Sequence, residues 1–408
     1  MIRLRDTRHQ NTASFLGSAI RVAEYYGFVP FEDALKTAQQ SIARDPSRRP
    51  PAFAKNETEI AFTRREERAL AAVAKRAAQS LRSANPLEQQ AHLFWRTTEI
   101  TGSLPSMSLE LHILGARGAI AEALLLIVAG AIAEEAGLAQ RVLSINNIGS
   151  FESSNRYVRD VGTYLRKHLE SISPTLRPRA ATDPLGTLIQ LIERGHPAIP
   201  RAPQAMEYLT EDERRRFWEL LDYLEAFGIS YELSPTVLGS RDCWAHALYE
   251  VSIMDQETNS KIPFAFGGRY DPLAARFGHT GGAATIAISC ELKGKQGFKR
   301  QVAGVPAIYL AHLGLEARRS SLQALEQLRR AEIPVYHNLY MEKIGDQMNQ
   351  ARSLATPYVI IIGYKEATEG TAMVREVATN SQESIPLPEL PGYLKRRRVG
   401  NWKGELTR

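Results

Sequence analysis

The chain has 408 residues, of which 44% are hydrophobic and 24% are charged. This composition is typical of a globular protein, and the length predicts two or three domains with a large core. With only two cysteines, Cys243 and Cys290, the sequence excludes a disulfide framework and a thiolate metal cluster. The formal net charge of +6 permits a polyanionic partner without requiring one.

No targeting or membrane segment is expected. The first residues are charged and lack the apolar stretch of a signal peptide. The longest apolar run, Ala119–Ala133, carries Glu122 and is shorter than the roughly 20 residues that a membrane span needs. We therefore expect a buried helix there, and a soluble, cytoplasmic protein that makes no membrane contact.

The first part of the chain mixes helices with strands. Apolar residues at helical spacing between Phe15 and Tyr26, with Gly27 at a C-cap position, predict an opening helix that leads into an extended piece at Phe28–Phe31. Helices are further predicted over 64–82, 119–136 and most of 157–224. Strands are predicted over 92–96, 109–114, 142–147, 229–233 and 247–254, while 284–292 fits either a strand or the entry to a buried helix.

The last part of the chain alternates strands and helices after a basic, glycine-bearing linker at 293–301. Strands are predicted at 307–310, 335–336, 358–363 and finally 373–377, with helices at 322–328 and 348–354. This alternation indicates a compact α/β domain of roughly one hundred residues.

The strongest chemical pattern is Gly267-Gly268-Arg269-Tyr270-Asp271. Adjacent glycines admit the close approach of another backbone. Arg269 offers a planar fork suited to a carboxylate or phosphate, and the next two residues add a hydroxyl and a carboxylate. The pattern fits a small-molecule pocket. It also fits a Gly-Gly turn at the end of a strand, with Arg269 and Asp271 as a surface ion pair.

This segment resembles the Gly-Gly-Arg-Tyr-Asp signature of histidyl-tRNA synthetases, whose arginine and tyrosine line the histidine-binding pocket. The resemblance covers nearly the whole chain, and the last domain carries its best-matching segments: Leu328–Val335, Gln347–Ala351, Tyr358–Gly363 with Glu366 and Gly370, and Thr379 with Gln382.

The resemblance implies a class II synthetase fold. We expect an α+β core over 1–295, an antiparallel sheet with helices, carrying a helical insertion at about 157–224. An α/β anticodon-binding-like domain is expected over 305–395, and a basic tail over 396–408.

The positions that hold ATP in the family depart from its pattern. In the stretch that corresponds to motif 2, Arg96 and Glu99 lie about one residue out of register. The arginine that ends motif 3 is replaced by Leu292, directly after Glu291. Each lost donor costs roughly 3 kcal/mol of transition-state stabilisation, so these changes argue against ordinary aminoacylation.

A second family signature is altered in the same way. Its arginine, which assists activation, corresponds to Gly239, and Arg241 lies two residues further on. Asp242 and Glu250 match the signature, whereas the proline of motif 1, associated with the dimer interface, is replaced by Ala34.

From the resemblance we assign candidate roles. The candidate catalytic residues are Arg96, Arg241 and Arg269. The candidate ligand-binding residues are Glu99, Asp242, Glu250, Gly267, Gly268, Tyr270, Asp271 and Glu291. ATP with Mg²⁺ is the expected cofactor if the protein is active, and otherwise none; no resident metal site is expected.

The end of the chain carries candidate RNA contacts. The run Lys395-Arg396-Arg397-Arg398, with Trp402 after it, combines charges for phosphate neutralisation with a ring for base stacking, although it also fits a solvated tail. The resemblance adds Lys343 and Gln347, at a helix entry that the family places near RNA. A further set is suited to stacking and base-edge contacts: Tyr336, His337, Asn338 and Tyr340.

Three hypotheses follow. The first is a synthetase-like paralogue that binds tRNA or another RNA through its last domain, with weak or no aminoacylation. The second is an active but divergent histidine–tRNA ligase that uses Arg96, Arg241 and Arg269. The third is a regulatory or accessory subunit whose pocket senses histidine or a related ligand. The family also implies a homodimer.

Overall fold

The computed structural model describes residues 12–45, 65–81, 91–100, 106–138, 140–254, 260–279, 281–291, 306–397 and 399. The chain divides into two compact units. We call them the core unit, which comprises Met1–Phe15 and Val29–Gln296, and the C-terminal unit, which comprises Leu16–Phe28 and Gly297–Arg408. The linker expected at 293–301 lies outside the described residues.

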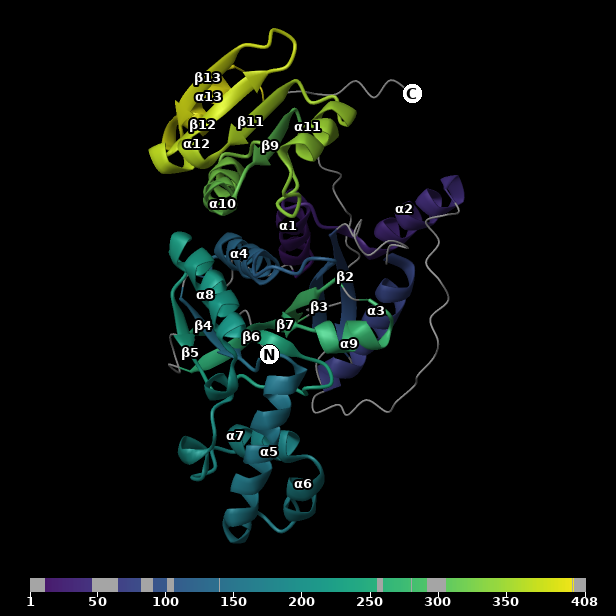
Figure 1. Cartoon of the computed structure of the whole chain (residues 1–408), viewed down its shortest axis with the longest axis vertical. Helices are drawn as coiled ribbons and strands as arrows, with labels where there is room; N and C mark the ends of the chain where they lie inside the picture. Colours follow the sequence, from purple (N-terminus) through teal and green to yellow (C-terminus); the bar gives the residue numbers. More distant parts are fainter. Residues whose placement is uncertain are drawn as a thin grey trace. The chain divides into compact units, whose positions relative to one another are not determined.

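The core unit is built on an eight-stranded sheet with the order β1-β2-β3-β8-β7-β6-β4-β5 (Figure 1). The six strands from β2 to β4 in this order pair antiparallel, and only the two edge strands pair parallel to their neighbours. The strands are β1 (Val29–Pro30), β2 (His92–Ile100), β3 (Ser106–Leu114), β4 (Arg141–Asn147), β5 (Tyr231–Leu233), β6 (Ala245–Met254), β7 (Lys261–Arg269) and β8 (Ala283–Glu291). The predicted antiparallel sheet with helices is thus confirmed, and 284–292 is resolved as a strand.

The core unit also contains the helices α2 (Phe31–Arg44), α3 (Arg65–Leu81), α4 (Ile120–Glu135), α5 (Phe151–Lys167), α6 (Arg177–Thr182), α7 (Pro184–Glu193), α8 (Glu211–Ala226) and α9 (Asp271–Arg276). Of these, α5, α6 and α7 pack on one another in a lobe that projects from the sheet (Figure 1). The apolar run predicted to be a buried helix is α4, which packs on β3, β7 and β8 and is buried along nearly its whole length. Within the described part of the chain, no helix is long and apolar enough to cross a membrane.

The extended piece expected at Phe28–Phe31 is shorter than predicted. Only Val29 and Pro30 form a strand, and α2 begins at Phe31. Pro30 precedes the helix in an extended conformation, and Glu32 and Asp33 lie in the first turn, where carboxylates interact favourably with the helix dipole. These start signals identify a helix that the sequence analysis missed.

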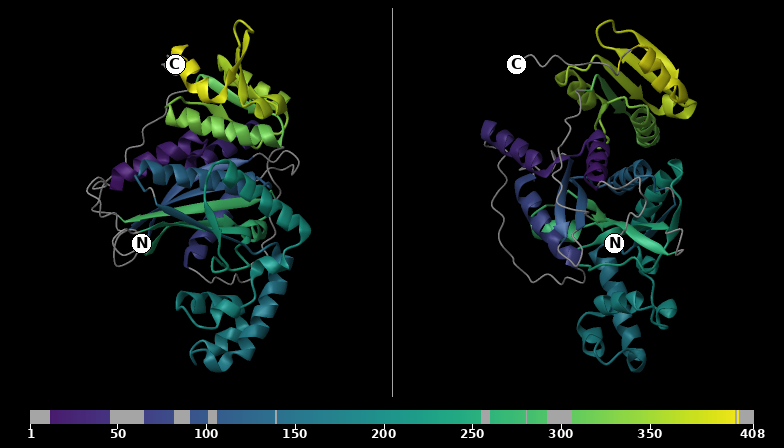
Figure 2. Two further views of the ribbon diagram at one scale, coloured as in Figure 1. Left: turned by 90° about the vertical axis from the view of Figure 1, so that its left-hand side faces the viewer. Right: turned by 180° about the vertical axis from the view of Figure 1, so that it is seen from behind.

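The C-terminal unit contains a five-stranded sheet with the order β10-β9-β11-β12-β13 (Figure 2). Its elements are β9 (Ile308–His312), α10 (Leu315–Arg330), β10 (Tyr336–His337), α11 (Ile344–Ser353), β11 (Tyr358–Ile362), α12 (Tyr364–Glu369), β12 (Thr371–Glu376), β13 (Gln382–Pro386) and α13 (Leu390–Arg396). The parallel β9–β11 part confirms the predicted alternation. The strand predicted as the last one is β12, and β13 follows it as an antiparallel neighbour.

The second half of α1 (Thr12–Tyr25) groups with the C-terminal unit, although the sequence analysis placed it within a core over 1–295. Tyr25 donates from its hydroxyl to the carbonyls of Leu325 (3.2 Å) and Ile333 (2.9 Å). The neighbouring Tyr26 hydroxyl bonds to the Glu326 carboxylate on α10. Two adjacent tyrosines therefore attach the end of α1 to α10.

Gly267 and Gly268 lie inside β7 and not in a turn. A Cβ atom at Gly267 would meet the Thr285 carbonyl oxygen at 2.1 Å, and one at Gly268 would meet the Ala247 carbonyl oxygen at 2.8 Å. The close backbone approach predicted for these glycines is therefore the approach of β8 and β6.

We predict that Gly267→Ala destabilises the protein by about 1–3 kcal/mol, because a backbone carbonyl obstructs the new methyl group. The matched control is Gly130→Ala in α4, where nothing lies within 4 Å of the new Cβ and alanine favours a helix by roughly 0.5–1 kcal/mol. Urea unfolding measures both changes. Equal stability of the two variants would contradict the packing role of Gly267.

Candidate functional site on the core sheet

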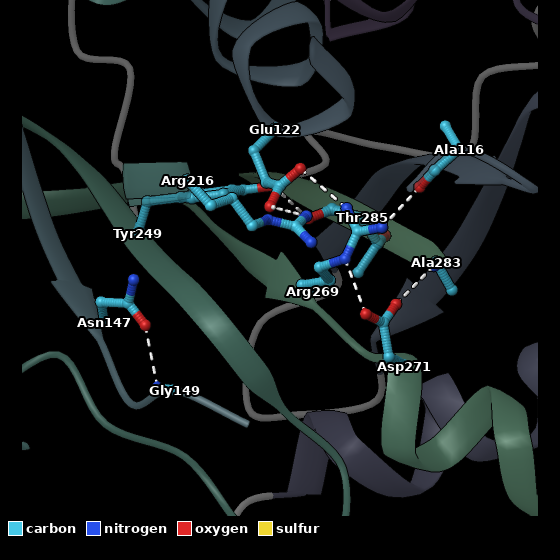
Figure 3. Close-up of polar contacts among 10 residues, drawn as sticks. All are labelled: Ala116, Glu122, Asn147, Gly149, Arg216, Tyr249, Arg269, Asp271, Ala283 and Thr285. Carbon is cyan, nitrogen blue, oxygen red and sulfur yellow. Dashed lines mark hydrogen bonds and ion pairs between the residues drawn. The ribbon is translucent and has the colours of Figure 1, made fainter. Parts of the chain in front are cut away.

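Arg269 is buried in the core, and Figure 3 shows its guanidinium between Glu122, Ala116 and Asp271. Its side chain is 1% exposed and forms ion pairs with Glu122 on α4 (2.8 Å) and with Asp271 (2.7 Å). The remaining terminal nitrogen donates to the Ala116 carbonyl. One of the two interpretations of the motif placed the pair with Asp271 at the surface, and the pair forms instead where the guanidinium is buried.

A second arginine completes this network. Arg216, on α8, donates to the other Glu122 oxygen at 3.0 Å. Burial would raise the pKa of Glu122, but the charges of Arg269 and Arg216 outweigh it and lower the pKa. Burial would also lower the pKa of Arg269, and the two carboxylates raise it instead. Both groups therefore remain ionised inside the protein.

Tyr270 follows Arg269 directly and points to the other side of the sheet, as successive residues of extended chain do. Its hydroxyl lies 3.3 Å from Nδ1 of His112, a buried residue of β3. Arg269 faces α4, whereas Tyr270 faces the opposite side. The two residues that the resemblance assigned to one pocket are thus separated by the sheet.

The side of the sheet that faces away from α4, which we call the polar face, carries a row of register partners. The row runs Arg96, Glu110, Ala287, Phe266 and Glu250 across β2, β3, β8, β7 and β6. All but Glu110 are half-buried, and Glu110 is 9% exposed. This row therefore forms a half-buried polar strip across the core sheet.

Arg96 already has partners on the polar face. Its Nε lies 3.4 Å from the Glu110 carboxylate, and Nη2 donates to the Thr98 hydroxyl at 2.6 Å. Glu99 was expected to act beside Arg96, but strand alternation places it on the opposite face, where it is exposed. Glu291 is the last residue of β8 and pairs with Ser106. It lies two positions beyond Ser289, which pairs with Ser108.

Three further nominated residues lie in the loop before β6 and in β6 itself. Arg241 bonds to Asn155 on α5, and Asp242 forms an ion pair with Arg276 on α9 at 3.2 Å. Glu250 accepts a hydrogen bond from Ser252 at 3.2 Å. Each of these charged or polar side chains is therefore engaged with another part of the protein.

Gly239, at the position of the family's activating arginine, lies under Trp244. A Cβ at Gly239 would meet the indole Cδ1 at 2.4 Å. The indole is held in place because its Nε1 donates to Glu67 at 3.0 Å and its ring meets Phe266 edge-on at 5.6 Å. A tryptophan thus occupies the space that a side chain at position 239 needs.

These placements do not fit a bound ATP with Mg²⁺. Arg96 and Arg269 lie on opposite faces of the sheet, and Arg241 is engaged with α5. A triphosphate requires cations that converge from one side. Among the residues that the structure describes, no cluster of histidine, cysteine and acidic side chains can hold a metal ion.

The structure separates the candidate RNA contacts. Lys343, Lys395, Arg396 and Arg397 are exposed, and Arg397 contacts Glu383 at 3.3 Å. Gln347 is fully buried: it bonds to both backbone groups of His312 and to the Met341 carbonyl. The prediction for Gln347 was wrong, because its amide ties a loop to β9 and does not face solvent. Arg398 lies outside the described residues.

Sequence reasoning missed Glu110, His112 and Arg216, and noted Glu122 only as an interruption of an apolar run. A signal was present in β3, where polar Ser108, Glu110 and His112 alternate with leucine and isoleucine. Such alternation marks one polar and one apolar face of a strand. The partners on α4 and α8 carry no equivalent sequence signal.

The comparisons with known proteins agree with the fold. Residues 309–397 match the model of the anticodon binding domain. Over 292 residues the chain is 27% identical to the histidine–tRNA ligase of Thermosynechococcus vestitus, a match that covers 69% of this chain and 66% of that protein. The chain is therefore similar to histidine–tRNA ligases over most of its length.

Two solved structures are also similar to this chain. One is apo histidyl-tRNA synthetase from S. aureus, with 19% identity, a TM-score of 0.48, and coverage of 97% of this chain and 100% of that one. The other is an ATP phosphoribosyltransferase regulatory subunit/histidyl-tRNA synthetase from Bacillus halodurans, with 13% identity, a TM-score of 0.42, and coverage of 89% and 96% respectively.

For the core unit we predict that Arg269→Met costs about 3–5 kcal/mol, because it leaves Glu122 with one buried partner fewer. The double variant Arg269→Met/Glu122→Gln should cost less than the sum of the two single changes. Arg241→Met, which removes a charge from a half-buried contact, should cost under about 1 kcal/mol. Urea denaturation tests all four proteins. A loss at Arg269 as small as that at Arg241 would contradict its structural role.

We also predict a pH dependence from His246, which lies beside this network. Burial, together with repulsion from Arg216 and Arg269, lowers its pKa to about 4 from the ordinary 6.5. The unfolded chain therefore binds the proton more readily, and stability is lost as the pH falls from 6.5 towards 4, by up to about 1.4 kcal/mol per pH unit.

The variant His246→Asn isolates this effect, since asparagine tolerates the positive φ of 52° found there and does not titrate in this range. Chemical denaturation at several pH values should show a shallower loss for the variant than for the wild type. Parallel curves would rule out His246 as the titrating group.

Proposed function

We propose that this protein is a histidyl-tRNA synthetase-like RNA-binding protein that aminoacylates tRNA weakly or not at all. The C-terminal unit binds tRNA or another RNA, and the core unit keeps the family fold without the arrangement of cations that adenylate formation needs.

We infer the absence of efficient catalysis from one observation. Two of the nominated catalytic arginines lie on opposite faces of the sheet. Arg96 is paired with Glu110 on the polar face, and Arg269 is buried with Glu122 on the α4 face. Trp244 fills the space above Gly239. Activation of an amino acid requires several cations aimed at one triphosphate, each worth about 3 kcal/mol or more.

RNA binding is supported by the match of residues 309–397 to the anticodon binding domain. At the end of that region, Lys395 and Arg396 lie in the last turn of α13 and are exposed. Exposed cations on a domain of this kind can neutralise RNA phosphates. Lys343 adds another exposed cation at the start of α11.

The catalytic part is tested by histidine-dependent exchange of pyrophosphate into ATP. The folded protein should show no exchange above the background without histidine. Clear exchange would overturn this part of the proposal and favour the active, divergent ligase instead.

The RNA part is tested by tRNA binding at several salt concentrations. Lys395→Gln/Arg396→Gln should weaken binding and reduce the slope of log Kd against log salt by about 1.4, the value for two lost single-strand phosphate contacts. The matched control is Arg352→Gln/Lys365→Gln, which removes the same charge from two other exposed positions of the same unit. Equal effects of the two double variants would show a general charge effect and remove the α13 residues from the interface.

A further inference from the structure

His112 lies in an environment that is specific for an imidazole. Its ring is fully buried and stacks on Phe94 with centroids 4.9 Å apart and planes at 14°. Phe94 in turn stacks on Phe31 at 4.7 Å, and the Tyr270 ring meets the imidazole edge-on at 5.9 Å. Aromatic side chains therefore enclose the ring both from one face and from an edge.

Both ring nitrogens face polar groups with complementary hydrogen-bonding roles. Nε2 lies 3.4 Å from Glu110, and Nδ1 lies 3.3 Å from the Tyr270 hydroxyl. Burial would raise the pKa of Glu110, but its contacts with His112 and Arg96 lower it, so the carboxylate is ionised. Burial also lowers the pKa of His112 and raises that of Tyr270.

These protonation states fix the tautomer. A carboxylate only accepts hydrogen bonds, so the proton of the neutral ring is on Nε2, directed towards Glu110. Nδ1 is then an acceptor, and the protonated Tyr270 hydroxyl donates to it. An acceptor for one nitrogen, a donor for the other and a stacking ring together make a complete recognition site for a neutral imidazole.

We propose that this is an imidazole-binding site filled by the protein's own His112, which closes the Tyr270 position to free histidine. The resemblance assigns Tyr270 to a histidine pocket, and here the hydroxyl of that tyrosine is used by a side chain of the same protein. The inference rests on the proposed function in that the core does not activate histidine, but its test measures ligand binding alone, without ATP or RNA.

The test removes the ring and supplies it from solution. His112→Ala should leave a hole that 4-methylimidazole, the histidine side chain as a free molecule, fills. We expect saturable binding by calorimetry and a rise in the Tm of the variant, with no response of the wild type to 4-methylimidazole or to histidine. Because no nucleotide or RNA is present, failure here is distinct from failure of the exchange and tRNA assays.

His312→Ala is the matched control, because it removes a ring that is equally buried, at 1% exposure, from the C-terminal unit. It should not respond to 4-methylimidazole. A folded His112→Ala variant that ignores the ligand, or responds no more than His312→Ala, would overturn the proposal. So would a saturable rise in the Tm of the wild type on addition of histidine.

A conservative variant covers the case in which His112→Ala does not fold. Tyr270→Phe removes only the hydroxyl, and in ¹⁵N NMR it should shift the Nδ1 resonance of His112 while leaving that of His312 unchanged. Millimolar histidine should leave the His112 resonances of the wild type unmoved. An unshifted Nδ1 in Tyr270→Phe, or wild-type His112 resonances that move with histidine, would contradict the proposed contact.

Discussion

The ion pair between Arg269 and Glu122 joins the centre of the sheet to α4. Glu122 lies in the first turn of α4, before a long apolar stretch, and it is buried only because Arg269 and Arg216 neutralise it from β7 and α8. Removing two charges from water is costly, so the remaining hydrogen-bonding positions must also be filled. Asp271 and the Ala116 carbonyl meet that requirement. Gly282 leaves space for the guanidinium, since a Cβ there would lie 2.3 Å from it.

Once Arg269 is committed to this side of the sheet, the alternation of side chains along extended chain commits Tyr270 to the other. The polar face is therefore organised by contacts that do not involve Arg269. There, a series of polar contacts runs from Tyr270 through His112 and Glu110 to Arg96. These contacts link the buried end of the face to its half-buried row. The family's most recognisable motif thus contributes stability on one face and an internal histidine contact on the other.

The sequence was sufficient for the class of fold and for most elements, because periodicity, glycine and proline positions act locally. The apolar run that became α4 and the strands around the Gly-Gly motif are examples. It was insufficient for the site, since the partners of Arg269 come from 147 and 153 positions away in the chain. Gln347 shows the same limit, because a buried amide and an exposed one look alike in a sequence. Strand alternation alone, however, already implied that Arg269 and Tyr270 face opposite ways.

The indole of Trp244 has a consequence for the substitutions that position 239 tolerates. An arginine at position 239 collides with the indole, and loss of the indole alone leaves Glu67 without that donor and a gap above Phe266. Each change is therefore disfavoured without the other. The residues at positions 239 and 244 are coupled through packing, so a side chain at position 239 requires a simultaneous change at position 244.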